Sequence, residues 1–141
     1  MLKQALYAAV ILAAWFHPAE AATIVAHEED KVIFREGRMD HSEGQFENTY
    51  YLDLDKDILT RTRVYDYQAK KITPDETVYQ IQKQLRSHPD KSARFSVTPS
   101  IRAFGQPADD AVEIIVIKDD YVQSVVSTGD EIIISRAKRL K

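Results

Sequence analysis

The chain contains no cysteine and only four glycines in 141 residues. Without cysteine it can form no disulfide bond, thiol nucleophile, iron–sulfur cluster, thiolate zinc site or lipid attachment through that residue. No glycine-rich segment of the kind that cradles a phosphate is present, and no Gly-x-Ser-x-Gly turn occurs. The strongest sequence signatures of redox, nucleotide-binding and serine-hydrolase chemistry are therefore missing.

The chain also lacks a strong excess of one charge, because its formal net charge is only −3. That balance gives no reason to expect nucleic acid or an anionic membrane surface as a partner. After the N-terminal segment, no apolar run approaches the roughly 20 residues that span a bilayer. We therefore expect no nucleic-acid partner and no stable membrane insertion of the mature protein.

The N-terminal segment has the layout of an export signal. A positive charge at Lys3 precedes an apolar run from Ala5 to Phe16, and small side chains follow at Ala19 and Ala21. This order is typical of a secretory signal peptide, and the apolar run is too short to span a bilayer. We predict cleavage after Ala21 and a periplasmic or secreted location.

Removal of the signal peptide, residues 1–21, leaves residues 22–141. This length is typical of one globular domain. It is also long enough to bury a core without a metal ion or a disulfide bond. We therefore expect a single globular domain.

Alternating apolar and polar residues predict mostly extended structure in this domain. The clearest strands are Ala111–Ile117, Tyr121–Ser127 and Glu131–Arg136, whose short connections predict an antiparallel meander. Thr23–Ala26 and Lys31–Arg35 predict a hairpin with a charged turn between them. The remaining segments are predicted strands at 46–54, 58–67, 95–97 and 101–104, and predicted loops at 37–44 and 105–110.

One segment predicts a helix. Thr73–Glu76 has a hydroxyl at the cap, proline at the first helical position and glutamate at the third, as in a capping box. Val78, Ile81 and Leu85 follow at helical spacing. These features predict a helix over Pro74–Ser87.

The alternative for this segment is a strand in which Thr77, Tyr79, Ile81 and Leu85 are the core residues. With the helix, the fold class is α+β: a mostly antiparallel sheet of six to eight strands with one packed helix. An all-β barrel is the runner-up. The proline and the capping box favour the first of these.

Metal sites and cofactors are not expected. Asp53, Asp55 and Asp57 have the alternate spacing of a calcium loop, but Ile58 and Val64 occupy the positions of its required glycine and glutamate. The histidines lack the paired spacing of a zinc site. No residue stands in a setting that predicts a catalytic nucleophile.

The most suggestive feature is a row of Arg61, Arg63, Tyr65 and Tyr67, which alternation places on one face of a predicted strand. Guanidinium groups can bind a carboxylate or phosphate in bidentate fashion, and both residue types are enriched at protein interfaces. The alternative is an ordinary solvated sheet face, where arginine stems cover the tyrosine rings. As a binding row, it would take another envelope protein or a small anionic ligand.

Two classes of function fit these observations. The first is a non-catalytic exported binding or accessory module, favoured by the absence of strong catalytic motifs. The second is a small cell-envelope hydrolase whose carboxylates converge only in the fold, since acidic pairs cannot be located from sequence.

The first prediction concerns export. The mature protein should begin at Ala22, because Ala19 and Ala21 are the small residues that a signal peptidase requires. N-terminal sequencing of the protein from a periplasmic fraction measures this directly. An intact form that retains Met1 and sediments with membranes would show that the segment is an anchor instead.

Overall fold

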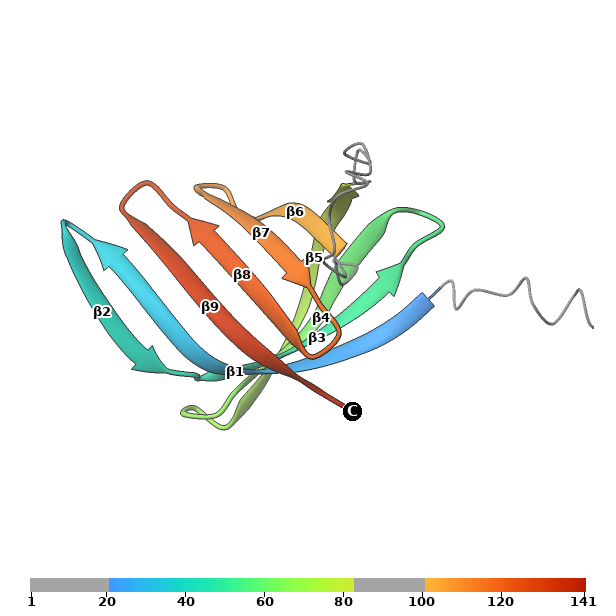
Figure 1. The fold of residues 1–141 in the computed structure, drawn as a ribbon, viewed down its shortest axis with the longest axis horizontal. Helices are drawn as coiled ribbons and strands as arrows, with labels where there is room; N and C mark the ends of the chain where they lie inside the picture. Colours follow the sequence, from blue (N-terminus) through green and yellow to red (C-terminus); the bar gives the residue numbers. More distant parts are fainter. Residues whose placement is uncertain (1–20, 83–100) are drawn as a thin grey trace, which may run out of the picture.

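The structure is a computed structural model that describes residues 21–82 and 101–141. These two ranges form nine antiparallel strands and contain no helix (Figure 1). The strands are β1 (Ala21–Arg35), β2 (Arg38–Glu43), β3 (Phe46–Asp53), β4 (Ile58–Asp66), β5 (Lys71–Gln82), β6 (Ile101–Ala108), β7 (Ala111–Ile117), β8 (Tyr121–Ser127) and β9 (Glu131–Leu140).

Eight of the strands close into a barrel. The sheet order is β2-β1-β3-β4-β5-β6-β7-β8-β9, and β1 also pairs with β9. The pairing of β1 with β9 closes the sheet into a barrel. β2 remains outside the barrel as an edge strand on β1 (Figure 1). Closure pairs the first and last strands of the barrel, whose outer edges an open sheet would leave exposed.

The long strand β1 replaces the hairpin predicted for Thr23–Ala26 and Lys31–Arg35, so that prediction is wrong. The first half of β1 pairs with β3 and its second half with β2, while β9 pairs along both halves. The register with β9 shifts between Glu28 and Asp30. The charged residues taken for a turn therefore form a β-bulge, which bends a strand without reversing it.

The loop predicted for residues 37–44 is also mostly wrong. Glu36 and Gly37, with φ of 50° and 73°, form the two-residue turn after β1. Positive φ at both positions is the conformation of the type I′ hairpin turn, whose twist matches that of the flanking strands. The chain therefore returns at once as β2, although every residue of β2 is polar or exposed.

The predicted helix over Pro74–Ser87 is wrong for its described part, which belongs to β5; residues 83–87 lie outside the described ranges. The alternative prediction of a strand describes this segment instead, because Tyr79 and Ile81 are buried while Val78 and Gln80 are exposed. The carboxylate of Asp75, which would suit a helix start, accepts hydrogen bonds from strand neighbours and from β4.

Proline is tolerated in β5 because of its position along the strand. Pro74 faces Arg63 of β4 beside an irregularity in register, and β6 begins to pair with β5 only at Tyr79. Among the described strands, this part of β5 pairs with β4 alone, and proline is tolerated in strands at such an edge.

The α+β assignment is therefore corrected to all-β, the runner-up architecture. The three C-terminal strands are confirmed, with β7 and β8 at their predicted bounds and β9 extended to Leu140. The predicted loop at 105–110 is shorter than expected, since β6 continues to Ala108. The predicted signal peptide up to residue 20 and the predicted strand at 95–97 lie outside the described ranges.

The apolar core fills the barrel toward the end at which β1 begins. Its members are inward-facing residues of all eight barrel strands, and the largest of those that are fully buried are Leu59, Tyr79 and Ile115. Gly105 faces the ring of Tyr79, where a Cβ atom would overlap the aromatic carbons. The other core residues are Ile24, Ala26, Tyr50, Leu52, Ile81, Ala103, Ile117, Val122 and Ala137.

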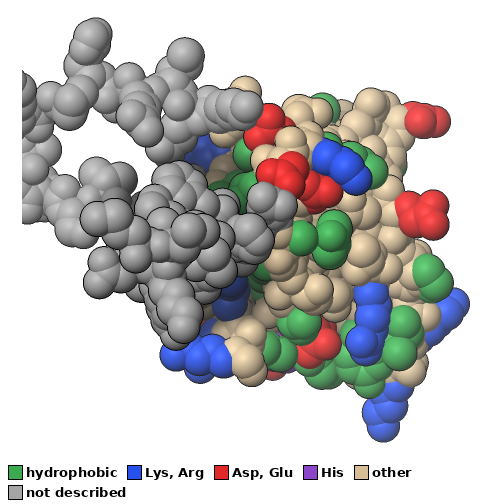
Figure 2. Space-filling view, turned by 90° about the vertical axis from the view of Figure 1, so that its right-hand side faces the viewer, with side chains coloured by type: hydrophobic (Ala, Val, Ile, Leu, Met, Phe, Trp, Pro, Cys, Tyr) green, Lys and Arg blue, Asp and Glu red, His purple; other side chains and the backbone are tan. Residues whose placement is uncertain are grey.

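The outer surface is mixed in character. In the view of Figure 2, acidic, basic and apolar side chains are interspersed on the face that the grey atoms leave visible. No segment of the two described ranges forms a helix of sufficient length and apolarity to span a membrane.

The second prediction concerns the junction between β2 and β3. Gly44 donates a backbone hydrogen bond to the carbonyl of Glu29, and a Cβ atom on it would overlap the carbonyl of Glu28. Gly44→Ala should therefore lower the free energy of unfolding by roughly 1–3 kcal/mol or more, as overpacking against backbone does. Urea denaturation measures the loss.

Gly129→Ala is the matched control, because a Cβ atom there meets no other atom within 4 Å. Its unfolding midpoint should stay near that of the wild type. Equal midpoints for both variants would mean that the β2–β3 junction is not packed against the β1 bulge.

Candidate functional site

The candidate site is a cavity of about 250 Å³ inside the barrel, which we call the lumen cavity. It lies toward the end of the barrel that carries the β1–β2, β6–β7 and β8–β9 turns, beyond the apolar core. An eight-stranded barrel is just wide enough to be filled by side chains or to hold one small ligand. The lining residues are Glu28, Lys31, Phe46, Asn48, Arg61, Val64, Glu113, Ser124, Val126, Ile133 and Ser135.

The floor of the lumen cavity is an ion pair between Arg61 of β4 and Glu113 of β7. The Arg61 Nη1 atom donates to Glu113 Oε2 at 3.2 Å, and Arg61 Nε donates to Asp75 Oδ2 at 3.0 Å. The hydroxyl of Tyr79 also donates to Glu113 Oε2, at 2.6 Å. The Glu113 side chain is 3% exposed and that of Arg61 is 15% exposed, so this network is largely removed from water.

The pKa values in this network follow from burial and from the neighbouring charges. Burial opposes the charge of Arg61, but the carboxylates of Glu113 and Asp75 outweigh it and raise the pKa of Arg61. Burial, reinforced by Glu113, raises the pKa of the Tyr79 phenol above its usual range. Arg61 therefore stays charged and Tyr79 stays protonated, so the hydroxyl remains a donor to Glu113.

Asp75 stays ionised for a different reason. Burial opposes its charge, but hydrogen bonds from the Thr77 hydroxyl and amide, followed by the charge of Arg61, hold the pKa of Asp75 below its usual value. The two bonds from Thr77 measure 2.6 and 2.7 Å. Asp75 therefore keeps a negative charge on Arg61 at neutral pH.

A second ion pair stands at the wall formed by β1. Glu28 accepts a hydrogen bond from the Gln45 amide at 3.1 Å, and the Lys31 ammonium lies 3.6 Å from the same carboxylate. The Lys31 ammonium also lies 5.2 Å from the centroid of the Phe46 ring. The bulge between Glu28 and Asp30 brings both charged residues, three apart in sequence, to the inner face.

The charges around the lumen cavity balance in its lining but not in the network behind it. The lining itself holds two carboxylates, Glu28 and Glu113, and two cations, Lys31 and Arg61. Asp75 lies outside the lining, binds Arg61 and adds a third carboxylate to the network. Each cation is already paired with at least one of these carboxylates. The site therefore offers no free cation for an anionic ligand, and with Asp75 the network has one negative charge in excess.

Hydroxyl and amide groups complete the polar lining. The Ser124 and Ser135 hydroxyls of β8 and β9 share a hydrogen bond of 2.8 Å. The side chain of Asn48 has no hydrogen bond to any residue in the described ranges. These groups can donate to and accept from a small molecule, while Phe46 and Val126 offer apolar surface.

The predicted row of Arg61, Arg63, Tyr65 and Tyr67 is divided by a β-bulge. No residue of β3 pairs with Thr62 in the strand register, because Thr49 pairs with Arg63 and Tyr50 with Arg61. Arg61 therefore faces the lumen, while Arg63 is exposed on the outside. An extra residue reverses the alternation of faces, so the two arginines do not form one clasp.

The aromatic part of the predicted row lies on the outer face. The Tyr65 and Tyr67 rings pack edge to face with 4.9 Å between their centroids, and the centroids of the His27 and Tyr67 rings are 4.7 Å apart. The Tyr67 hydroxyl donates to Glu47 Oε2 at 2.7 Å, and this bond raises the pKa of Tyr67 to about 12. Tyr67 is 38% exposed, so this cluster is accessible from solvent.

Among the described residues, no three histidine or acidic side chains converge as metal ligands would. Asp53, from the predicted calcium-like turn, accepts a hydrogen bond from the Lys56 amide and lies 3.5 Å from the Lys56 ammonium. Its carboxylate is therefore engaged within the turn.

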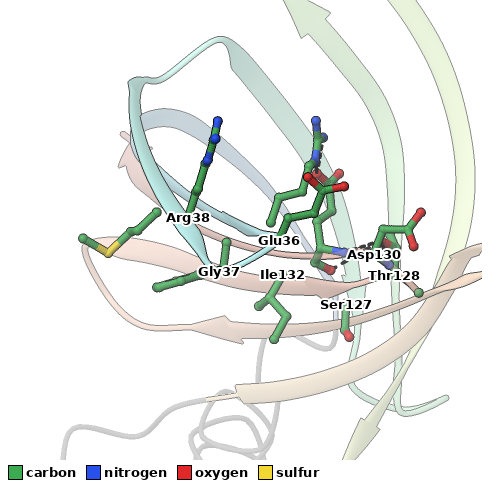
Figure 3. A pocket seen from close by; sticks show the side chains of 12 residues that line it. Glu36, Gly37, Arg38, Ser127, Thr128, Asp130 and Ile132 are labelled. Carbon is green, nitrogen blue, oxygen red and sulfur yellow. Dashed lines mark hydrogen bonds and ion pairs between the residues drawn. The ribbon is translucent and has the colours of Figure 1, made fainter.

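A second hollow, of about 510 Å³, lies where the β1–β2 and β8–β9 turns meet; we call it the hairpin groove. Figure 3 shows the two turns side by side, with Arg38 and Ile132 on opposite sides of the sheet. An ion pair between Arg35 and Glu131 joins the two hairpins. The hairpin groove is open and is lined by the two turns and the strand ends beside them, so it encloses a ligand less than the lumen cavity does.

Three lining residues, Glu28, Lys31 and Glu113, were not predicted from the sequence. Glu113 carries a detectable signal, because it is the only charged residue in the apolar strand Ala111–Ile117. A buried acid needs a partner, so its position alone predicts an internal cation. Glu28 and Lys31 carry no such signal, since they lie in a generally charged segment.

Comparison with known proteins adds no functional information. No family model, curated protein or solved structure matches this chain.

The third prediction concerns the floor of the lumen cavity. Arg61→Leu leaves Glu113 buried without its cation, so the free energy of unfolding should fall by about 3–5 kcal/mol. Arg63→Leu, on the same strand but exposed, should change it by less than about 0.5 kcal/mol. Chemical denaturation of both variants measures the difference.

The double variant Arg61→Leu/Glu113→Leu should be more stable than Arg61→Leu alone, because it removes the unpaired charge as well. Losses that simply add in the double variant would contradict a direct coupling between Arg61 and Glu113.

Proposed function

We propose that this protein is an exported, non-catalytic binding module that holds one small ligand in the lumen cavity. The observation that carries the proposal is the cavity itself: the barrel is filled by apolar side chains at one end and open beside paired charges at the other. At about 250 Å³, the cavity suits a compact molecule smaller than most drug-like ligands.

The chemistry of the lining favours a ligand with an apolar body and a cationic or neutral polar head. Phe46, Val64 and Val126 offer apolar contacts, and the Asn48 amide offers a free donor and acceptor. The charges of the lining balance, and the additional carboxylate of Asp75, which binds Arg61 from outside the lining, favours a positive head. A small anionic ligand, which the sequence predicts, would have to displace a carboxylate from Arg61 or Lys31.

Binding fits the lumen better than hydrolysis does. The carboxylates of Glu28 and Glu113 each accept hydrogen bonds and face a cation, so neither is positioned as a free acid or base. Such saturated networks hold side chains in place. The alternative of an envelope hydrolase therefore has no particular observation in its favour.

Export is supported by the order of the chain. The predicted cleavage after Ala21 would remove the signal-like segment and a single described residue of β1. For the outer surface, Arg63, Tyr65 and Tyr67 stay a prediction as a contact for another envelope protein.

The fourth prediction tests the ligand class with three probes of similar size: benzamidine, benzyl alcohol and benzoate. Benzamidine should bind best, with an affinity about tenfold above that of benzoate, because about 1.4 kcal/mol of charge preference corresponds to a factor of ten. Calorimetric titration and amide chemical shifts of lumen residues measure binding and its location.

Ser124→Phe, which fills the lumen cavity, should abolish binding. Ser127→Phe, on the exposed end of the same strand, should not. A preference for benzoate would contradict the proposed cationic head and would favour the anionic ligand predicted from the sequence. If no probe binds and Ser124→Phe raises stability, the cavity is only a packing defect and the proposal fails.

A further inference from the structure

Among the described strands, none pairs with the outer edge of β2. Strand β2 pairs with β1 on one side only and is the terminal strand of the sheet (Figure 1). In a two-residue hairpin, the residues that close the turn exchange hydrogen bonds, and the direction of the backbone groups then alternates. Since Arg35 and Arg38 close this turn, the N–H and C=O groups of Met39 and His41 point to the free edge.

The side chains that flank Met39 carry opposite charges without ion-pair partners in the described residues. Arg38 lies opposite Arg35, a like charge that Glu131 already binds. Asp40 lies opposite Ile33. Like charges placed across a strand pair are unfavourable, so Arg38 has unused capacity for an acidic partner.

The outer face of the same hairpin carries an apolar row that ends at the free edge. Met39 pairs with Phe34, and Phe34 pairs with Ile132, so the three side chains lie side by side. They are 57%, 40% and 43% exposed, respectively. Adjacent exposed apolar residues of this kind mark an interaction surface more often than isolated ones do.

A second copy of the chain complements both features in one register. If two β2 strands pair antiparallel about a two-fold axis at Met39, Arg38 of each copy faces Asp40 of the other. Two ion pairs then form on one face of the sheet. On the opposite face, the two apolar rows meet at Met39 and become one continuous row.

The other registers that the backbone alternation allows are less favourable. A shift of the two-fold axis by one residue places Asp40 against Asp40 in one direction and Arg38 against Arg38 in the other. A further shift in the first direction places His41 against His41 and leaves Arg38 opposite Gly44, without an acid. Beyond that, Met39 would meet Gln45, whose carbonyl already accepts the Tyr67 amide at 2.9 Å.

We propose that the free edge of β2 is a homodimerisation site, at which two copies pair in this register and extend one sheet across both barrels. Such an isologous contact closes on itself, because each edge is used once. The lumen cavity lies inside each barrel and takes no part in the contact.

The fifth prediction tests the charge pairs. Sedimentation velocity of the purified protein should detect a dimer. Arg38→Asp and Asp40→Arg should each raise its dissociation constant about tenfold or more, through loss of attraction and new like-charge contacts. The exchange variant Arg38→Asp/Asp40→Arg should restore dimerisation. Arg102→Asp, an exposed change on β6, is the matched control and should leave the dimer intact.

Proline substitutions test the backbone pairing. Met39→Pro removes an amide of the free edge, so it should abolish the dimer and leave the monomer folded. Met39→Val keeps that amide and should still dimerise. Asp40→Pro removes an amide directed to β1 and should instead lower stability. A wild type that is monomeric at all concentrations, or a dimer that the charge exchange does not restore, would overturn the proposal.

Discussion

Closure of the barrel depends on the strand β1 and its bulge. β1 pairs with β9 along one edge, and it shares its other edge between β3 and β2. A single straight strand would keep one alternation of faces along its whole length, but the register shift between Glu28 and Asp30 changes it. Both Glu28 and Lys31 then face the lumen. Gly44 permits the close approach of the next turn to this bulge, so closure, the lumen charges and the position of β2 share one local cause.

The number of strands limits what the interior can hold. Eight strands leave room for about one layer of side chains across the lumen. Where the inward residues are Leu59, Tyr79 and Ile115, that space is filled. Where they are shorter or paired charges, as at Ser124, Ser135 and Glu113, a cavity remains. The buried ion pairs contribute little net stability, because desolvation offsets their attraction, but they exclude arrangements that would leave Glu113 unpaired. The floor of the cavity is therefore held in one geometry before any ligand enters.

Local pattern predicts the fold only where the signals in a segment agree. β7 and β8 combine β-branched residues, alternation and polar turns, and their predicted bounds are those of the structure. In β5, the signals conflict: Thr73–Glu76 has the chemistry of a helix start, while Thr77, Tyr79 and Ile81 alternate. The strand prevails because Tyr79 fills the space over Gly105 and reaches Glu113, contacts with residues far away in sequence. No local pattern reports those contacts. Closure of the sheet, which rests on the pairing of its first and last strands, is equally invisible in any single segment.

The candidate site also depends on strand pairing that local sequence patterns do not predict. The sequence placed Arg61 on one exposed face together with Arg63, whereas the structure places Arg61 in the lumen. Alternate residues share one face of a strand only while each residue pairs with one residue of the neighbouring strand. No residue of β3 pairs with Thr62 in the strand register, so Arg61 and Arg63, two residues apart, lie on opposite sides of the barrel wall. One of them is fixed by Asp75 and Glu113 inside, and the other remains in solvent. A row of like residues at period two is therefore evidence for a common face only where the pairing across the strand is known. The curvature of closed barrels favours bulges, and the position of a bulge depends on the pairing with neighbouring strands. The sequence of a single strand does not show that pairing.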